Sequence, residues 1–215
     1  MSKPHLLAMP LASLTAVGLL ASDLYLPALP SMGAELAASI PAAQATMALF
    51  MIALALSQLV WGWAADHFGD RWTILAGTAL LAGGSLLCAL APGIDAMLAG
   101  RLVQGLGAGA ATVAVPALIR RRFSETDAVS ALAMVAMAES VIPAIGPAVG
   151  AAIVLYAGWR VTFWVIAVMS VALMPLAARI VGAAIEARVG AGLRAEARYW
   201  RMCHCCVTGR SCATP

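Results

Sequence analysis

Six long apolar runs constrain the fold of this chain more than any other feature of its sequence. Crossing the roughly 30 Å hydrocarbon core of a bilayer takes about 20 mostly apolar residues in an α-helix. The runs have this length, and they are continuous rather than alternating, which argues against membrane-spanning β-strands. The sequence therefore predicts an all-α integral membrane protein with six transmembrane helices, at residues 6–26, 46–65, 72–90, 96–119, 129–156 and 161–178.

The composition excludes a soluble domain. Of the 215 residues, 63% are hydrophobic and only 11% are charged, whereas a soluble domain carries roughly 25% charged residues to cover its core. The formal net charge is +3, but the basic residues stand at the edges of the apolar runs and form no patch of the kind that binds nucleic acid. We therefore expect the lipid bilayer, and no nucleic acid, to surround this chain.

The basic residues also predict its orientation, because Lys and Arg are enriched in the cytoplasmic loops of membrane proteins. With the N-terminus in the cytoplasm, Arg160 is the one basic residue of the opposite loops. We therefore expect both termini to be cytoplasmic, together with the remaining basic residues near the runs, which are Lys3, Arg71, Arg120, Arg121, Arg122 and Arg179.

Residues 181–215 differ in composition from the six-helix region at 1–180. They hold four of the five cysteines, yet the spacing of these cysteines and of His204 matches no standard zinc-ligand pattern. We predict no metal site, and we interpret the segment as a cytoplasmic tail that is poorly ordered or translated out of frame.

Three ionisable side chains fall inside the runs: Asp23, Arg101 and Glu139. A charge within the bilayer is costly unless it faces a wet cavity or a partner, so such residues are functional candidates. A carboxyl group that binds and releases protons is what a proton-coupled carrier needs. Two alternatives stay open: Asp23 and Glu139 stand at span ends near the outer surface, or Arg101 extends to the surface along its aliphatic stem.

Small and polar residues follow Arg101 along the same predicted helix. Gln104 lies one turn after Arg101, while Gly105 and Gly109 form a face through which helices can approach closely, and Gly107 adds flexibility. An Arg and a Gln on one face favour a helix that lines a polar path, and plain helix packing is the alternative.

A short polar segment between the second and third runs contains Gly62, Asp66, Gly69 and Arg71. Gly69 permits the tight turn that so short a connection requires. Asp66 is placed to accept hydrogen bonds from free N–H groups at the start of the next helix. An ordinary polar loop with a helix cap would explain the same residues.

Two prolines and two glycines recur at four-residue spacing in the fifth run, at Pro143, Gly146, Pro147 and Gly150. Because Pro147 has no N–H to donate to the carbonyl of Pro143, we expect a kink there. A bend of this kind serves either gating or close packing, and the residues leave both open.

Taken together, these segments resemble the major facilitator superfamily, and within it the Bcr/CflA-type drug:proton antiporters. Residues 22–30 resemble the first-helix signature, 101–107 the fourth-helix motif and 143–150 the antiporter motif of that family, while 158–164 fit the start of its sixth helix. The resemblance associates Arg101 with proton coupling. It also implies a proton and substrate path formed by Asp23, Arg101, Gln104 and Glu139.

The chain departs from the family pattern in two motifs. The loop motif of the family normally has basic residues where His67 and Asp70 stand. Only Gly62, Asp66, Gly69 and Arg71 match that motif, so its full set of charges is not present here. The antiporter motif usually ends in two glycines, but Ala151 follows Gly150 here.

The resemblance extends to about residue 178 and covers six of the twelve helices that the family has. In that family the substrate site lies between two six-helix halves, which rock against each other during transport. The resemblance therefore implies a truncated multidrug exporter of the chloramphenicol type, which exchanges drug-like molecules for protons. It implies no cofactor, since the proton gradient supplies the energy, and it places the chain in a bacterial-type inner membrane.

Other functions are compatible with the same residues. One is an exporter of metabolites from the same superfamily. Another is a membrane fragment or subunit that does not transport alone and pairs with a second half or a second copy of itself. An intramembrane enzyme is disfavoured, because all three histidines lie outside the predicted spans, at His5, His67 and His204.

Overall fold

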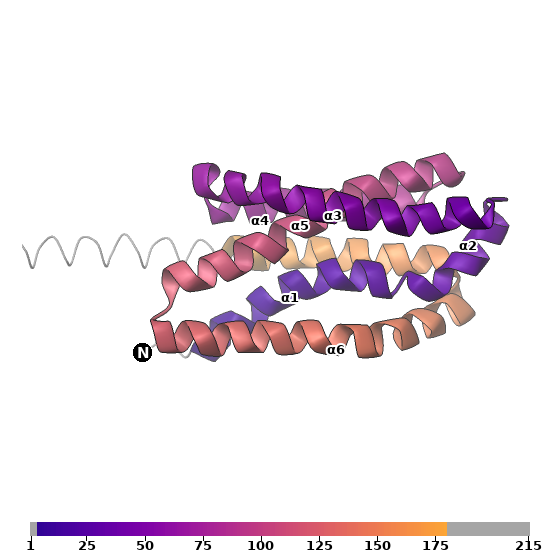
Figure 1. Cartoon of the computed structure of the whole chain (residues 1–215). Helices are drawn as coiled ribbons and strands as arrows, with labels where there is room; N and C mark the ends of the chain where they lie inside the picture. Colours follow the sequence, from indigo (N-terminus) through magenta and orange to yellow (C-terminus); the bar gives the residue numbers. More distant parts are fainter. Residues whose placement is uncertain (1–3, 180–215) are drawn as a thin grey trace, which may run out of the picture. The chain divides into compact units, whose positions relative to one another are not determined.

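The computed structural model describes residues 4–179, and within that range the chain is helical (Figure 1). Six of its helical segments are long and apolar enough to cross a membrane. The prediction of an all-α fold with six transmembrane helices is therefore confirmed. The elements in chain order are α1 (Pro4–Asp23), the 3-10 helix η1 (Leu26–Ala28), α2 (Leu29–Glu35), α3 (Ile40–Phe68), α4 (Asp70–Ala89), α5 (Ile94–Arg122), α6 (Glu125–Ala157) and a last helix, Trp159–Arg179.

The first span is longer than the apolar run that predicts it. The predicted span ends at residue 26, just before Pro27 and Pro30, but the helical path continues through η1 and α2 to Glu35. Each proline lies in the first turn of a new helical segment, where its missing N–H costs nothing and its fixed φ suits the helix. Asp23 therefore lies at a break within the first span and not at its end.

Two of the connections between spans consist of a single glycine. Gly69 joins α3 to α4 with φ 87° and ψ 155°, and Gly158 joins α6 to the last helix with φ 85° and ψ 163°. Side chains with a Cβ atom are strained in this backbone region, so it is essentially restricted to glycine. These two residues allow long helices to reverse direction without a loop.

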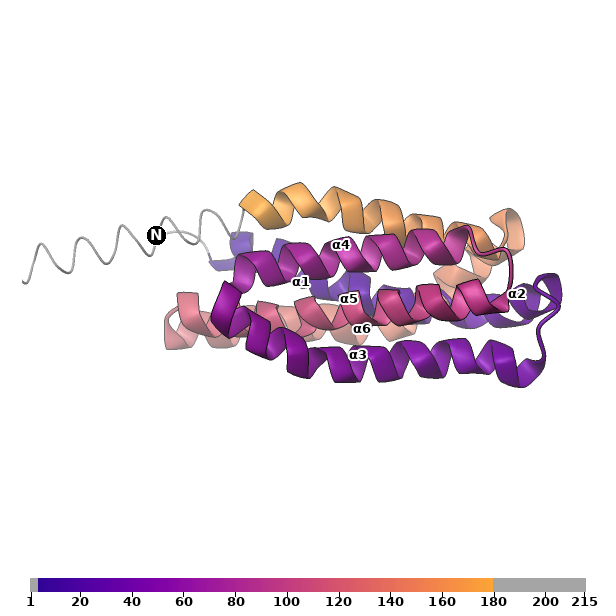
Figure 2. The ribbon, with the colours of Figure 1, turned by 90° about the horizontal axis from the view of Figure 1, so that it is seen from above.

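α5 is the central helix of the bundle. It packs most extensively against α4 and α3 and also contacts α1 and α6, while α1 runs along α6 (Figures 1 and 2). Of the most apolar 18-residue stretch of α5, 61% is buried within the bundle, compared with 17% for the corresponding stretch of α6 and 22% for that of α3. α6 and α3 therefore turn most of their apolar surface away from the bundle.

Glycines on α5 permit this packing. Gly105 and Gly109 face α3, where a Cβ atom on either would collide with that helix, and Gly107 is pressed in the same way against the backbone of α4. The face of small residues predicted from the sequence is thus a packing surface, and it brings polar side chains of neighbouring helices within hydrogen-bonding distance of α5.

Candidate functional site

Arg101 lies inside the bundle on α5, and its side chain is completely buried. Its Nη1 atom donates hydrogen bonds to the carbonyl oxygen of Ala21, at 3.0 Å, and to Oε1 of Gln104, at 2.7 Å. The guanidinium group therefore points into the protein. The alternative that Arg101 extends to the membrane surface is wrong for this structure, because α1 closes over the side chain.

Gln104 continues this polar chain toward α4. Its Nε2 atom donates to Oγ of Ser85 at 2.8 Å, and Ser85 in turn donates to the carbonyl oxygen of Leu81 at 2.7 Å. Each of these hydrogen bonds is donated in the direction from Arg101 to α4. Gln104 and Ser85 are fully buried. These hydrogen bonds hold the three side chains in place, because breaking any of them leaves a buried polar group without that partner.

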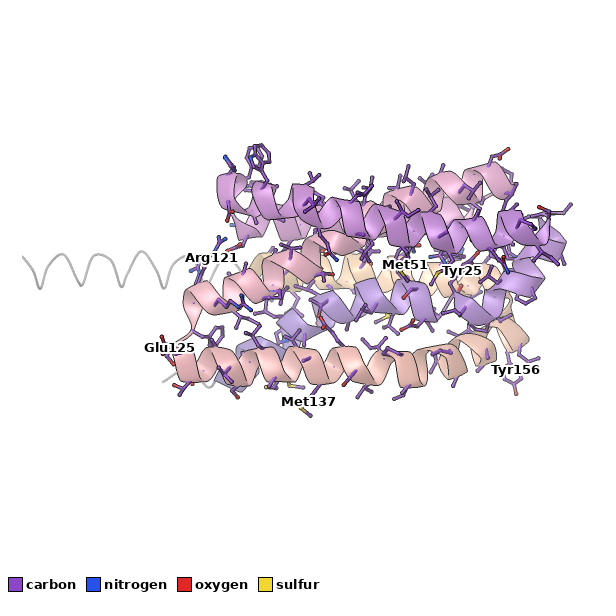
Figure 3. All side chains as sticks on the ribbon, viewed as in Figure 1. Tyr25, Met51, Arg121, Glu125, Met137 and Tyr156 are labelled. Atoms are coloured by element: carbon purple, nitrogen blue, oxygen red, sulfur yellow. The ribbon has the colours of Figure 1, made fainter. Side chains whose placement is uncertain are left out.

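Aromatic rings surround the guanidinium group of Arg101. Its Cζ atom lies 3.5 Å from the ring centroid of Tyr25, 5.1 Å from that of Phe163 and 5.2 Å from that of Phe50. Figure 3 labels Tyr25 in the interior of the bundle. We refer to these three rings as the aromatic box. No sequence pattern indicates this box, since an aromatic residue in an apolar run looks like an ordinary core residue.

Asp23 is the last residue of α1 and is partly buried. The hydroxyl group of Ser22 donates to its Oδ1 atom at 3.2 Å. In the described part of the chain Asp23 forms no ion pair, although Arg101 bonds to Ala21 only two residues away. The structure thus brings Asp23 and Arg101 to the same stretch of α1 without joining them.

The antiporter motif of α6 packs directly on this stretch. Gly146 lies against Asp23, and Gly150 lies against the backbone of Leu24. Pro143 and Pro147 are both inside α6, which continues from Glu125 to Ala157. The kink expected near Pro147 stays a prediction.

Glu139 is partly buried on the face of α6 that also carries Val135, Gly146 and Gly150, since these positions repeat at helical spacing. It forms no ion pair among the residues that the structure describes. Its position on the face that packs toward α1 keeps Glu139 a candidate for the proton and substrate path. It lies two helical turns before Gly146, however, and does not join the Arg101 network.

An apolar pocket of about 260 Å³ opens between α1, α6 and the last helix. Only apolar atoms are exposed in it, and Gly146 is the one of the two glycines and two prolines of the antiporter motif that lies in its wall. The other residues lining it are Leu20, Leu24, Val141, Ile142, Ile145, Val149, Ile153, Val165 and Met169.

The loop motif forms a charged cluster with a residue that the sequence analysis did not select. Nη2 of Arg121 lies 2.6 Å from Oδ1 of Asp66, and its Nη1 lies 3.5 Å from Oδ1 of Asp70. Arg121 stands near the end of α5, close to where α6 begins (Figure 3). An arginine thus contacts the aspartate that stands where the family has a basic residue.

The other loop-motif residues have plainer surroundings. Gly62 packs against Val113 of α5, Gly69 makes the turn described above, and Arg71 is exposed. His67 stacks on Trp63 with 4.4 Å between ring centroids, and its Nδ1 atom lies 2.9 Å from the carbonyl oxygen of that residue. His67 therefore does not take over the role of a basic residue in the cluster.

A second charged cluster lies at the opposite end of the helices. Glu35, at the end of α2, accepts a hydrogen bond of 2.6 Å from Nε1 of Trp159 and pairs with Nη1 of Arg160. Nη2 of Arg160 donates to the carbonyl oxygen of Ala91 at 3.3 Å. This cluster fastens α2, the connection between α4 and α5, and the start of the last helix to one another.

Within residues 4–179, no group of three His, Cys, Asp or Glu side chains is arranged to hold a metal ion. The one cysteine of that range, Cys88, is buried and has a free thiol. The cysteine-rich segment at 181–215 lies outside the described residues.

Comparisons with known proteins agree with the motifs. The family model described as Major Facilitator Superfamily matches residues 11–197, which is farther than the motifs themselves reach. Multidrug resistance protein MdtL of Escherichia coli O81 (strain ED1a) and that of Shigella dysenteriae serotype 1 (strain Sd197) are each 32% identical to the chain over 154 residues. The aligned region is 72% of this chain and 39% of either relative.

Proposed function

Since this chain belongs to the major facilitator superfamily of membrane transporters, we propose that it forms the N-terminal half of a proton-coupled exporter of drug-like molecules. The observation that carries this proposal is the completely buried cation of Arg101, bonded to the carbonyl oxygen of Ala21 on α1, two residues before the partly buried Asp23. Ionisable groups are costly in a membrane, and a cation and an acid on facing helices are what a proton-driven carrier uses.

In this proposal Asp23 is the group that gains and loses a proton. Asp23 lies at the break in the first span, and its carboxyl group forms no ion pair in the described region. A proton on Asp23 removes a negative charge from the surface between α1 and α6. A substrate that binds to the ionised carboxyl group of Asp23, or to the surface around it, then competes with the proton for this site. Such competition is the basis of antiport.

Arg101 and Gln104 provide a fixed frame for this exchange. Their bonds tie α5 to α1 and α4, so the charge of Arg101 stays at one position while Asp23 titrates. Glu139 is a second carboxyl group on the α6 face that packs toward α1, and we propose that it belongs to the same path. The close contact of Gly146 and Gly150 with α1 lets α6 respond to small shifts there.

The chain spans 39% of the length of the MdtL relatives that it matches, so transport by this chain is proposed to require a second set of helices. A complementary half or a second copy would cover the exposed apolar faces of α3 and α6. We place the protein in a bacterial-type inner membrane, with the Asp66–Arg121 cluster on the cytoplasmic side, because the basic residues concentrate there.

Two other functions are distinguishable from this one by experiment. A metabolite exporter would share the Arg101 network, because the network does not define the substrate. A non-transporting subunit would keep the fold and pair with another membrane protein, as its exposed small and apolar faces permit.

The test is drug accumulation in bacteria that lack their own major exporters and produce this chain, either alone or together with a complementary six-helix half. We expect lower accumulation of chloramphenicol-like drugs, sensitive to a protonophore and lost in the Asp23→Asn variant. Asp95→Asn is the matched control, because Asp95 lies in the first turn of α5 away from the network. Export of sugars or amino acids but not drugs would support the metabolite exporter. No export, together with cross-linking to another membrane protein, would support the subunit.

A further inference from the structure

The cation of Arg101 has no acidic partner in the described part of the chain. Its Nη1 atom bonds to a carbonyl and an amide oxygen, while Nε and Nη2 are buried without a hydrogen-bond partner. A buried charge that lacks both a counter-ion and a full set of hydrogen bonds is strongly unfavourable. Another group near Arg101 must therefore stabilise its charge.

The face of the Tyr25 ring is the group in the best position. The Cζ atom of Arg101 lies 3.5 Å from the Tyr25 ring centroid, well inside the range of about 6 Å over which cations are attracted to aromatic faces. Phe163 and Phe50 lie within that range but farther away. The attraction is strongest where water is excluded, as it is around this fully buried pair.

Tyr25 is itself held in place from two sides. Its hydroxyl group shares a hydrogen bond of 2.5 Å with that of Thr46 on α3 and lies 3.2 Å from Sδ of Met32. Its ring packs against Phe163 with 5.4 Å between centroids. Tyr25 lies two residues after Asp23, the last residue of α1, in the break before η1, and its ring covers the guanidinium group that α5 contributes.

We propose that Tyr25 is a positioning residue whose ring takes the place of a carboxylate beside Arg101 and so leaves the carboxyl group of Asp23 free to exchange protons. The inference rests on the proposed function, in which Asp23 titrates. Without the ring, we expect the cation to be compensated by an ion pair with Asp23, which lies two residues from the Ala21 carbonyl that Arg101 already contacts. The other titratable group that interacts with Arg101 is Cys88 of α4. Glu139 is partly buried on α6, two helical turns before the Gly146 that packs against Asp23.

The test reads the protonation of Asp23 directly and does not need transport. Membranes containing the full chain are treated with a hydrophobic carbodiimide, which reacts with protonated carboxyl groups, and labelling of Asp23 is measured by mass spectrometry from pH 5 to 9. Labelling of Asp95, which lies in the first turn of α5 outside the proposed path, is the internal control. Tyr25→Phe keeps the ring and removes only the hydroxyl group, whereas Tyr25→Leu removes the ring.

We expect Tyr25→Phe to label at Asp23 like the parent, within about twofold. Tyr25→Leu should label at least fivefold less at the same pH, because Arg101 then pairs with Asp23 and keeps it ionised. Labelling should return in the double variant Tyr25→Leu/Arg101→Met. Fluorinated phenylalanines at position 25, which weaken the ring's negative face with little change in shape, should reduce labelling stepwise.

Equal labelling of Asp23 in Tyr25→Leu and Tyr25→Phe would overturn the inference, and so would a loss that persists in the double variant. Thermal unfolding of each variant in detergent shows whether it folds. If Tyr25→Leu does not fold, the fluorinated series still decides the test. If the parent labels as expected but exports no drug, the proposed function fails while the role of Tyr25 stands.

Discussion

The Cβ atom of Asp23 lies so close to Gly146 of α6 that a Cβ atom added at Gly146 would stand 2.8 Å from it. Real Cβ atoms essentially never approach this closely, so α1 and α6 can meet here only because one of them carries a glycine. The candidate proton-binding residue and the antiporter motif therefore share a single contact, and its geometry depends on the absence of one methyl group.

Gly146→Ala is expected to destabilise the protein. Overpacking of a tight contact costs roughly 1–3 kcal/mol, which exceeds the gain of about 1 kcal/mol that alanine brings over glycine in a helix. Gly83→Ala in α4 is the matched control, because a Cβ atom there meets nothing within 4 Å. Denaturant unfolding in detergent should give a lower free energy of unfolding for Gly146→Ala and an equal or higher one for Gly83→Ala. Equal effects at both positions would contradict the contact.

Gly69→Ala is expected to destabilise the protein through the backbone alone. A Cβ atom at Gly69 touches nothing within 4 Å, but its φ of 87° is strained for any other residue and costs on the order of 1–3 kcal/mol. Gly93 also has open space around it, and its φ of −162° suits every residue. The thermal unfolding midpoint should therefore fall in Gly69→Ala and stay unchanged in Gly93→Ala.

The sequence predicted the helices and the Arg101–Gln104 pair because both depend on local signals. Long apolar runs indicate spans, and an arginine within such a run is rare enough to attract attention by itself. Tyr25 gave no comparable signal, because its role comes from the break after Asp23 and from the rotation of α5. Whether Asp23 lay at a span end or inside one also depended on Pro27, which the sequence pattern placed in a connection and the structure places in a helical turn.

Arg121 was missed for a different reason. It stands in a run of three arginines that the sequence presents as equivalent, and the run was interpreted only as a signal of orientation. Which of the three reaches Asp66 depends on the rotation of the end of α5 relative to the connection between α3 and α4. That rotation is set by packing along the whole length of the helices, and no local pattern reports it.

Gln104→Leu is expected to lower the stability of the protein by roughly 1–3 kcal/mol, the usual cost of leaving buried polar groups without partners. The substitution removes the acceptor of an Arg101 hydrogen bond and the donor to Ser85. Gln44→Leu introduces the same change at an exposed position of α3 and should have little effect. Urea or heat unfolding in detergent compares the two. A smaller loss for Gln104→Leu than for Gln44→Leu would mean that the network does not stabilise the bundle.

Arg121→Gln is expected to change stability by only about 0.2–1 kcal/mol, because its close ion pair with Asp66 is exposed to solvent, where salt screens it, and its contact with the buried Asp70 is long, at 3.5 Å. Arg120→Gln removes the same charge from the neighbouring exposed residue, which separates the pairing from the general effect of charge. At low salt, the unfolding midpoint of Arg121→Gln should differ from that of the parent. At 1 M salt, the two midpoints should converge. A double-mutant cycle with Asp66→Asn should then give a coupling energy of the same small size. A coupling near zero would show that Arg121 and Asp66 are neighbours without an energetic link.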